Sequence, residues 1–240
     1  MTAASYDAGK EFSIGNVFSR AWQLFTANFI FFFIVTFIVA LPNLLVTTNP
    51  DPSSFGWGFA IAIILGVVLN TVGQAVLLYA AFQYLRGHTV QPGEAVQLGL
   101  SRFLPLLGLA ILYGLGLALG LVLVIVPFFF LLVMWAVVVP ACVVEGLGPI
   151  ASMSRSTQLT KGHRWKIFGI IFLLLIVSVI GNKLIPLILA PAGLVVLSLG
   201  LVIWTAIWAA YWNCVLIMTY HDLRVAKEGV DTAQIASVFD

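Results

Sequence analysis

The chain has 240 residues, of which 62% are hydrophobic and 8% are charged, and its formal net charge is +2. Soluble domains have about 45–50% apolar and about 25% charged residues, so this composition excludes an ordinary soluble domain and indicates a protein dissolved in lipid. No Lys/Arg-rich tail suggests a nucleic-acid partner. The apolar runs are continuous and do not alternate as barrel strands do. The predicted fold class is therefore an all-α integral membrane protein.

Six transmembrane helices are predicted from the lengths of the apolar runs. A helix needs about 20 residues to cross a hydrocarbon core of about 30 Å. The long apolar runs lie at residues 28–47, 57–85, 103–144 and 167–220. The third run would be about 63 Å long as one helix, so it is expected to fold back near Pro127. The fourth is expected to form two spans, separated by an interfacial or re-entrant piece where Gly181–Pro186 and Ala190–Gly193 interrupt it.

The distribution of Lys and Arg predicts the orientation. With six spans, both termini and the loops at 86–102 and 145–166 share one side of the membrane. That side holds ten of the eleven Lys and Arg residues, and Lys183 alone falls on the other side. Because basic residues are retained in the cytoplasm, both termini are expected to be cytoplasmic.

Three repeated units, each an amphipathic helix followed by a two-span hairpin, are predicted at about 12–86, 87–145 and 146–225, with a cytoplasmic tail at about 226–240. In the first unit, residues 14–28 follow the helical period of about 100° per residue, with Ser13 as the expected N-cap. The apolar face of this helix consists of Ile14, Val17, Phe18, Ala21, Trp22, Leu24 and Phe25. Such a helix, placed before a span, is expected to lie in the plane of the headgroups.

The amphipathic segments of the other two units are less regular. Residues 92–103 are expected to form a helix whose apolar face holds Val96, Gly99, Leu100 and Phe103. The third segment starts at Gly148-Pro149, which suits a helix start, and runs to Lys161. Its amphipathicity is poor because Leu159 falls on the polar side near Arg155.

Three stretches carry a resemblance to a known family: F-S-I-G-N-V-F-S-R-A-W-Q-L-F (12–25), V-V-E-G-L-G-P-I-A-S-M-S-R-S-T-Q-L-T-K-G-H-R-W-K-I-F (143–168) and Y-H-D-L-R-V-A-K-E-G (220–229). They resemble the membrane domain found ahead of some glycerophosphodiester phosphodiesterases and the related YciC-like bacterial inner-membrane proteins. The resemblance implies a multi-pass protein of the bacterial inner (cytoplasmic) membrane. The expected tail after the last span is too short for a catalytic phosphodiesterase domain, so no catalysis is implied.

The loop at 145–166 supplies the first group of candidate site residues. Glu145 is expected to form a structural ion pair with Arg155, Arg164 or Lys166, and the functional alternative is a carboxylate that couples protons or cations. A lipid-headgroup or anion site is predicted at the polar residues of the loop, namely Arg155, Ser156, Lys161, Arg164 and Lys166. Anionic lipid headgroups on the cytoplasmic side are the expected partners.

The spans supply the second group of candidates. Asn70, Thr71 and Gln74 form an intramembrane polar face, which either bonds to a neighbouring helix or lines a path for a substrate. Helix packing is predicted at Gly114, Gly116, Gly120, Trp204, Trp208 and Trp212. The tryptophans at i, i+4 and i+8 could alternatively hold a cofactor. Cys142 and Cys214 are expected to be buried thiols.

The leading functional hypothesis is a non-enzymatic membrane protein, either an accessory subunit, a scaffold or a lipid-associated envelope factor. A membrane-protein partner or a homo-oligomer would fit the small-residue faces. The alternative is a small-molecule or lipid transporter, which a water-filled or lipid-filled cavity lined by Asn70 and Gln74 would favour. A membrane enzyme would need carboxylates or histidines converging at one interface, where the sequence offers only Glu145 with His163. No metal or cofactor is expected, because the His and Cys spacings match no ligand motif.

Overall fold

The computed structural model describes residues 12–42, 57–88, 91–122 and 125–229, and all regular elements in these ranges are helices. Their bounds are α1 Ile14–Ala27, α2 Phe29–Ala40, α4 Trp57–Leu85, α5 Pro92–Ser101, α6 Phe103–Val122, α7 Ile125–Met134, α8 Val138–Val144, α9 Pro149–Thr160, α10 Arg164–Leu189, the 3₁₀ turn η2 Ala190–Ala192 and α11 Leu194–Glu228. The predicted all-α class is confirmed. Five helical segments are long and apolar enough to cross a membrane, or six if α1 and α2 form one bent span. The chain is therefore a multi-pass membrane protein.

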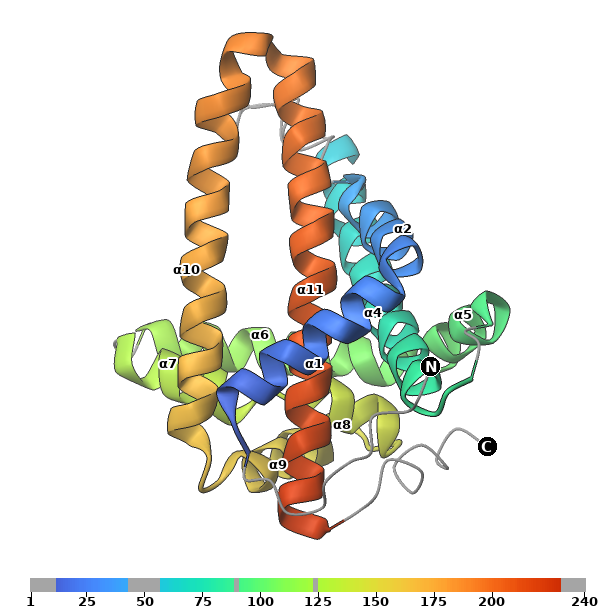
Figure 1. Cartoon of the computed structure of the whole chain (residues 1–240), viewed down its shortest axis with the longest axis vertical. Helices are drawn as coiled ribbons and strands as arrows, with labels where there is room; N and C mark the ends of the chain where they lie inside the picture. The colour runs from blue at the N-terminus through green and yellow to red at the C-terminus, as the bar shows by residue number, and fades with distance from the viewer. Residues whose placement is uncertain (1–11, 43–56, 89–90, 123–124, 230–240) are drawn as a thin grey trace.

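The first predicted span joins the preceding amphipathic helix through a sharp bend. The axes of α1 and α2 differ by 88° across Asn28, and α1 crosses the lower half of α11 (Figure 1). Ser13 is the N-cap residue of α1, although its side chain makes no capping hydrogen bond. The buried residues of α1 belong to its predicted apolar face, but Trp22 is 56% exposed. The part of the first span from residue 43 lies outside the described residues.

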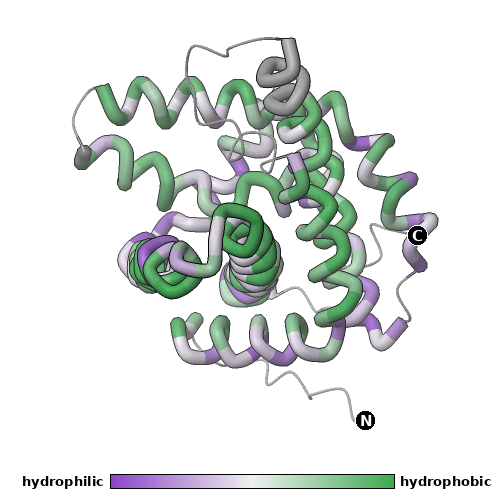
Figure 2. The backbone as a smooth tube through the Cα atoms, turned by 90° about the horizontal axis from the view of Figure 1, so that it is seen from above, coloured by the Kyte–Doolittle hydropathy of each residue, from purple (hydrophilic) through white to green (hydrophobic). Residues whose placement is uncertain are grey.

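The long hairpin of α10 and α11 stands apart from the hairpin of α6 and α7. Figures 1 and 2 show α10 and α11 running along the longest axis of the molecule, whereas α6 and α7 run across it. Both hairpins are mostly hydrophobic along their length (Figure 2). The axes of the two hairpins run in crossing directions. In this arrangement, only one hairpin can lie perpendicular to the plane of a membrane. The transverse α6–α7 hairpin lies nearer to the start of α10 and the end of α11 than to the turn that joins these two helices (Figure 1).

The segment predicted as the fourth span is interrupted. The preceding hairpin turn lies just before Pro127, which occupies the first turn of α7, where a proline is tolerated. A second break, which the sequence analysis did not predict, falls at residues 135–137 between α7 and α8. Pro140 explains it, because proline has no N–H for the carbonyl of Ala136 and its ring clashes with that carbonyl in a regular helix.

The predicted interruption of the last block at Gly181–Pro186 is wrong. Helix α10 continues through both residues to Leu189, and the turn is confined to η2 and Gly193, whose φ of 97° is a conformation that favours glycine. Helix α11 then continues beyond the predicted end near Tyr220 to Glu228. Its 35 residues correspond to about 52 Å. This length exceeds a hydrocarbon core of about 30 Å, so part of α11 extends outside the core.

The predicted apolar face of α5 is only partly covered by the rest of the protein. Its member Gly99 is buried, as is Ala95, whereas Val96 and Leu100 are 47% and 62% exposed. A Cβ on Gly99 would lie 3.1 Å from the carbonyl oxygen of Val72, so the small residues, and not the large ones, allow α5 to pack on α4.

Close packing of α10 on α11 uses two glycines, Gly181 and Gly200, of which Gly181 makes the closer approach. A Cβ on Gly181 would lie 1.8 Å from Cζ2 of Trp204, so the indole occupies the space that any other side chain would need. We expect Gly181→Leu to lower the free energy of unfolding by about 1–3 kcal/mol through overpacking. Thermal unfolding of the purified protein in detergent measures this. Gly114→Leu is the matched control, because a Cβ at Gly114 has no neighbour within 4 Å. Equal melting temperatures for the two variants would contradict the packing role of Gly181.

Candidate functional site

A network of charged side chains joins α8, α9 and α11 at one end of the molecule. The Glu145 network, as we call it, consists of Glu145, Arg155, Tyr220, Arg224 and Glu228. Arg155 Nε donates to both carboxylate oxygens of Glu145, at 2.9 and 2.7 Å, and its Nη2 donates to Glu228. The Tyr220 hydroxyl donates to Glu145 at 2.9 Å. Arg224 Nε donates to Glu228 at 2.9 Å, which closes the network.

The charges of the Glu145 network balance, because two carboxylates face two guanidinium groups. Burial by itself would lower the pKa of Arg155, but its hydrogen bonds to Glu145 and Glu228 outweigh this and raise the pKa above the ordinary arginine value. Arg155 therefore stays charged. Its hydrogen bonds hold Glu145, which directly follows α8, against Glu228 at the end of α11. Glu145 thus pairs with Arg155, one of the three partners expected from the sequence.

The five residues predicted as an anion site do not come together as one site. Arg155 is neutralised by two glutamates. Ser156 is fully buried and donates to the carbonyl of Met134 at 3.0 Å, so it faces the protein interior. Lys166 Nζ donates to the carbonyl of Phe12 at 2.8 Å.

The other two residues of that predicted site differ in their surroundings. Arg164 lies over the ring of Phe130, with its guanidinium carbon 4.9 Å from the ring centroid. Its Nε is buried and has no hydrogen-bond partner among the described residues. Lys161 is exposed. We therefore correct the predicted five-residue site, because Arg155 and Ser156 are engaged within the protein.

A second buried ion pair was missed by the sequence analysis. Arg20 of α1 donates to Asp222 of α11, and His221 Nδ1 lies 3.2 Å from the same carboxylate oxygen of Asp222. His221 is fully buried and Asp222 is 8% exposed. The pair fixes α1 across α11. The partners are separated by 202 residues, so no local spacing could reveal the pair; the charges of Arg20 and Asp222 were the available signal.

A cavity of about 590 Å³ lies between α4, α6, the α7–α8 junction and the α10–α11 hairpin. This volume falls within the range of about 300–1,000 Å³ typical of small-molecule sites. The predicted polar face lines it with Asn70, Thr71 and Gln74, and the predicted tryptophan stripe with Trp204, Trp208 and Trp212. We call it the inter-hairpin cavity. Two features considered separately in the sequence therefore meet at one site.

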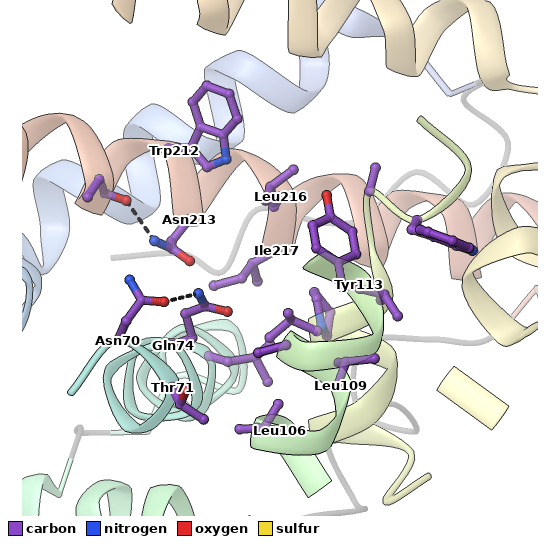
Figure 3. Close-up of a pocket in the computed structure, with 18 of the residues that line it drawn as sticks. Asn70, Thr71, Gln74, Leu106, Leu109, Tyr113, Trp212, Asn213, Leu216 and Ile217 are labelled. Atoms are coloured by element: carbon purple, nitrogen blue, oxygen red, sulfur yellow. Dashed lines mark hydrogen bonds between the residues drawn. The ribbon is translucent and has the colours of Figure 1, made fainter. Parts of the chain in front are cut away.

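Within the described ranges, the side-chain amides and hydroxyls of the inter-hairpin cavity bond inside their own helices. Gln74 donates to Asn70 at 2.6 Å within α4, and Thr71 donates to the carbonyl of Val67 at 2.7 Å. Asn213 donates to the carbonyl of Ala209 at 2.8 Å within α11 (Figure 3). Asn182 donates to the carbonyl of Ser178 within α10. Asn182 and Asn213 line the cavity but were missed, because a single amide in a long apolar run gives no periodic signal.

Apolar and aromatic side chains form the rest of the wall. Trp204 and Trp208 stack with their centroids 5.6 Å apart and an interplanar angle of 7°. Trp208 Nε1 is buried and has no hydrogen-bond partner in the described part of the chain. Figure 3 shows Asn70, Gln74 and Asn213 on one side of the cavity and Leu106 and Leu109 on the other. The cavity thus combines a polar side with an apolar side.

The predicted helix-packing residues have different roles. Gly116 and Gly120 pack inside the α6–α7 hairpin, because a Cβ there would lie 2.5 Å from Trp135 and 3.2 Å from Cα of Phe128, respectively. Gly114 contacts nothing within 4 Å of a Cβ position, so its predicted packing role is not seen within the described chain. Trp204 packs on Gly181. Cys142 and Cys214 are free and buried, as predicted.

The described residues include no group of three or more His, Cys, Asp or Glu that could hold a metal ion. Fold and site together define a multi-pass membrane protein whose described part is all-helical and has a cavity between its two hairpins. Comparison with known protein families, with curated proteins and with solved structures finds no match for this chain.

The Glu145–Arg155 pair should be energetically coupled. Both side chains are less than one quarter exposed, so removing either one leaves the other charge partly buried. We expect Glu145→Ala and Arg155→Ala each to destabilise the protein, and the double variant to show a coupling energy of about 1–3 kcal/mol. Thermal unfolding of all four proteins in detergent provides the cycle, and Lys161→Ala serves as the exposed control. If the destabilisations of the two single variants simply add in the double variant, the ion pair contributes no stability beyond that of the two separate side chains.

Proposed function

We propose that this protein is a non-enzymatic, lipid-associated membrane protein that binds a lipid in the inter-hairpin cavity. The observation that carries the proposal is the lining of that cavity, in which amides of α4, α10 and α11 face the same space as stacked indoles and leucines. A ligand with one polar and one apolar part matches such a lining. Membrane lipids are the molecules of this kind that surround the protein.

The energetics of the bilayer support an occupied cavity. Inside the hydrocarbon region no bulk water satisfies polar groups, and an unsatisfied buried donor or acceptor costs about 1–3 kcal/mol. The side-chain oxygens of Gln74 and Asn213 accept no hydrogen bond within the described chain. A bound molecule with a hydroxyl group satisfies them, while its apolar part fills the space beside Leu106 and Leu109.

We also propose that the Glu145 network lies on the cytoplasmic side, together with both termini. Because α10 and α11 are antiparallel, the start of α10 at Arg164 and the end of α11 at Glu228 share one end, and Lys183 lies toward the other (Figure 1). The basic residues of 155–166 and 224–227 therefore gather at one end, which supports the orientation predicted from the sequence.

The order of the helices supports the three-unit layout as a proposal. Each expected unit opens with a helix of 10 to 14 residues, namely α1, α5 and α9. The resemblance to YciC-like proteins and to the phosphodiesterase-linked membrane domain supports a place in the bacterial inner membrane. It also supports a role in the envelope without catalysis.

A second candidate function is transport of a lipid or small molecule across the membrane. The inter-hairpin cavity is the specific observation in its favour, because transporters hold substrate between helices at mid-depth. A vesicle flux assay separates the two: a binding protein retains its lipid, whereas a transporter equilibrates it between leaflets. An accessory or scaffold role with a membrane-protein partner is compatible with lipid binding and would appear as a co-purifying protein.

Filling the cavity should remove the bound lipid. Ala209 lines the cavity, and its replacement by Phe adds a ring to the space. We expect Ala209→Phe to lower lipid retention at least several-fold, measured by native mass spectrometry of protein extracted with its own lipids. The control is Ala118→Phe, at an exposed position of α6 away from the cavity. Wild-type protein without any retained lipid, or equal retention in both variants, would contradict the proposed function.

The orientation can be tested by cysteine labelling in intact cells. Cys142 and Cys214 are buried, so a new exposed cysteine should dominate the signal. We expect Lys183→Cys to react with an impermeant maleimide from outside and Lys161→Cys to react only after the membrane is opened. The reverse pattern would show that the Glu145 network faces outward.

A further inference from the structure

We propose that the inter-hairpin cavity selects an uncharged lipid of the diacylglycerol type, with a free hydroxyl and an ester carbonyl, and excludes lipids with a phosphate headgroup. This inference rests on the proposed function and specifies its ligand class. It follows from three properties of the cavity: the lack of charge, the arrangement of donors and acceptors, and the separation of polar and apolar walls.

The first property is electrostatic. None of the described residues lining the cavity is Asp, Glu, Lys, Arg or His. A phosphate placed there would lose its hydration without gaining a counter-charge, which is among the most unfavourable transfers in proteins. The cations of 155–166 and 224–227 lie instead at the end of the α10–α11 hairpin. An anionic headgroup therefore has a better site outside the cavity than within it.

The second property is the pattern of hydrogen-bonding groups. Gln74 and Asn213 each use a side-chain N–H inside their own helix. Their carboxamide oxygens point into the space between α4, α11 and α6 (Figure 3). These oxygens accept a hydrogen bond from a ligand hydroxyl. The hydroxyl of Tyr113, which lies on α6 across the cavity from Gln74 and Asn213 (Figure 3), donates to a ligand oxygen. The ligand therefore carries both a donor and an acceptor.

The third property is the placement of the apolar wall. Leu106 and Leu109 lie opposite Asn70, Gln74 and Asn213 (Figure 3), and Leu216 and Ile217 extend the apolar surface along α11. A headgroup on the amide side leaves an acyl chain against the leucines. A quinone supplies acceptors without a donor, and a triacylglycerol has no hydroxyl, so each leaves one part of this pattern unmatched.

The test is a headgroup series in which the acyl chains stay constant. Wild-type protein in lipid nanodiscs is equilibrated with diacylglycerol, phosphatidic acid or triacylglycerol of identical chains, and the bound lipid is quantified by native mass spectrometry. We expect diacylglycerol to bind about tenfold better than either of the others, as one unmatched buried polar group predicts. Phosphatidic acid or triacylglycerol binding as well as diacylglycerol would overturn the inference.

A side-chain comparison assigns the selectivity to the cavity. Tyr113→Phe keeps the ring but removes the hydroxyl, and Asn213→Leu removes an acceptor. Both are expected to reduce the preference for diacylglycerol over triacylglycerol or phosphatidic acid at least threefold. Trp165→Phe alters an indole that is 86% exposed and should leave the preference unchanged. Preferences that are identical in all three variants would overturn the inference.

The series also separates the two proposals. If the protein binds lipids and Ala209→Phe abolishes binding, but the headgroup makes no difference, the lipid-binding function stands and the selectivity fails. If no lipid of the series binds and Ala209→Phe changes nothing, both fail. The headgroup series itself uses the wild-type protein, so misfolding of a variant can neither create nor remove a headgroup preference.

Discussion

The architecture depends on one requirement of the bilayer, that a broken helix must find partners for its backbone within the protein. The break between α7 and α8 leaves the carbonyl of Met134 without its usual partner, because the N–H of Val138 bonds to Trp135 instead. Ser156 and Thr160 of α9, both fully buried, supply hydroxyls to that carbonyl. Helix α9 is thus bound to the break by its small polar residues. A serine expected to meet lipid phosphate is instead part of the core.

That contact determines where the charges lie. With α9 held against the end of α7, Arg155 is directed away from the break toward the carboxylate of Glu145. Glu145 directly follows α8, and its carboxylate also accepts a hydrogen bond from the Tyr220 hydroxyl of α11. Asp222, two residues after Tyr220 on α11, pairs with Arg20 and so joins α1 to the same part of α11. The C-terminal third of α11 is therefore the element on which α1, α8 and α9 converge.

Composition and apolar run length predicted the class, the helices and most of their ends, because these depend on the solvent and on local steric rules. The direction of α6 and α7 relative to α10 and α11 could not be predicted, since both hairpins are equally apolar. The continuity of α10 through Gly181 and Pro186 was also hidden. The glycine there serves contact with Trp204, and that contact exists only after α11 folds back. Local sequence identified Asn70, Gln74 and Trp208 as candidates, but only tertiary structure brings them to one cavity.

The polar residues of the inter-hairpin cavity need an explanation other than helix association. Amides within membrane helices commonly bond across to a neighbour. Here Gln74 bonds within α4 and Asn213 within α11, so these bonds hold no two helices together. The contact of α10 with α11 is made by Gly181 and Trp204. Amide oxygens that neither join helices nor balance a charge still have unused hydrogen-bonding capacity. A bound molecule with an uncharged polar head would use that capacity, and this is why we propose the cavity, and not the cationic end of the hairpin, as the ligand site.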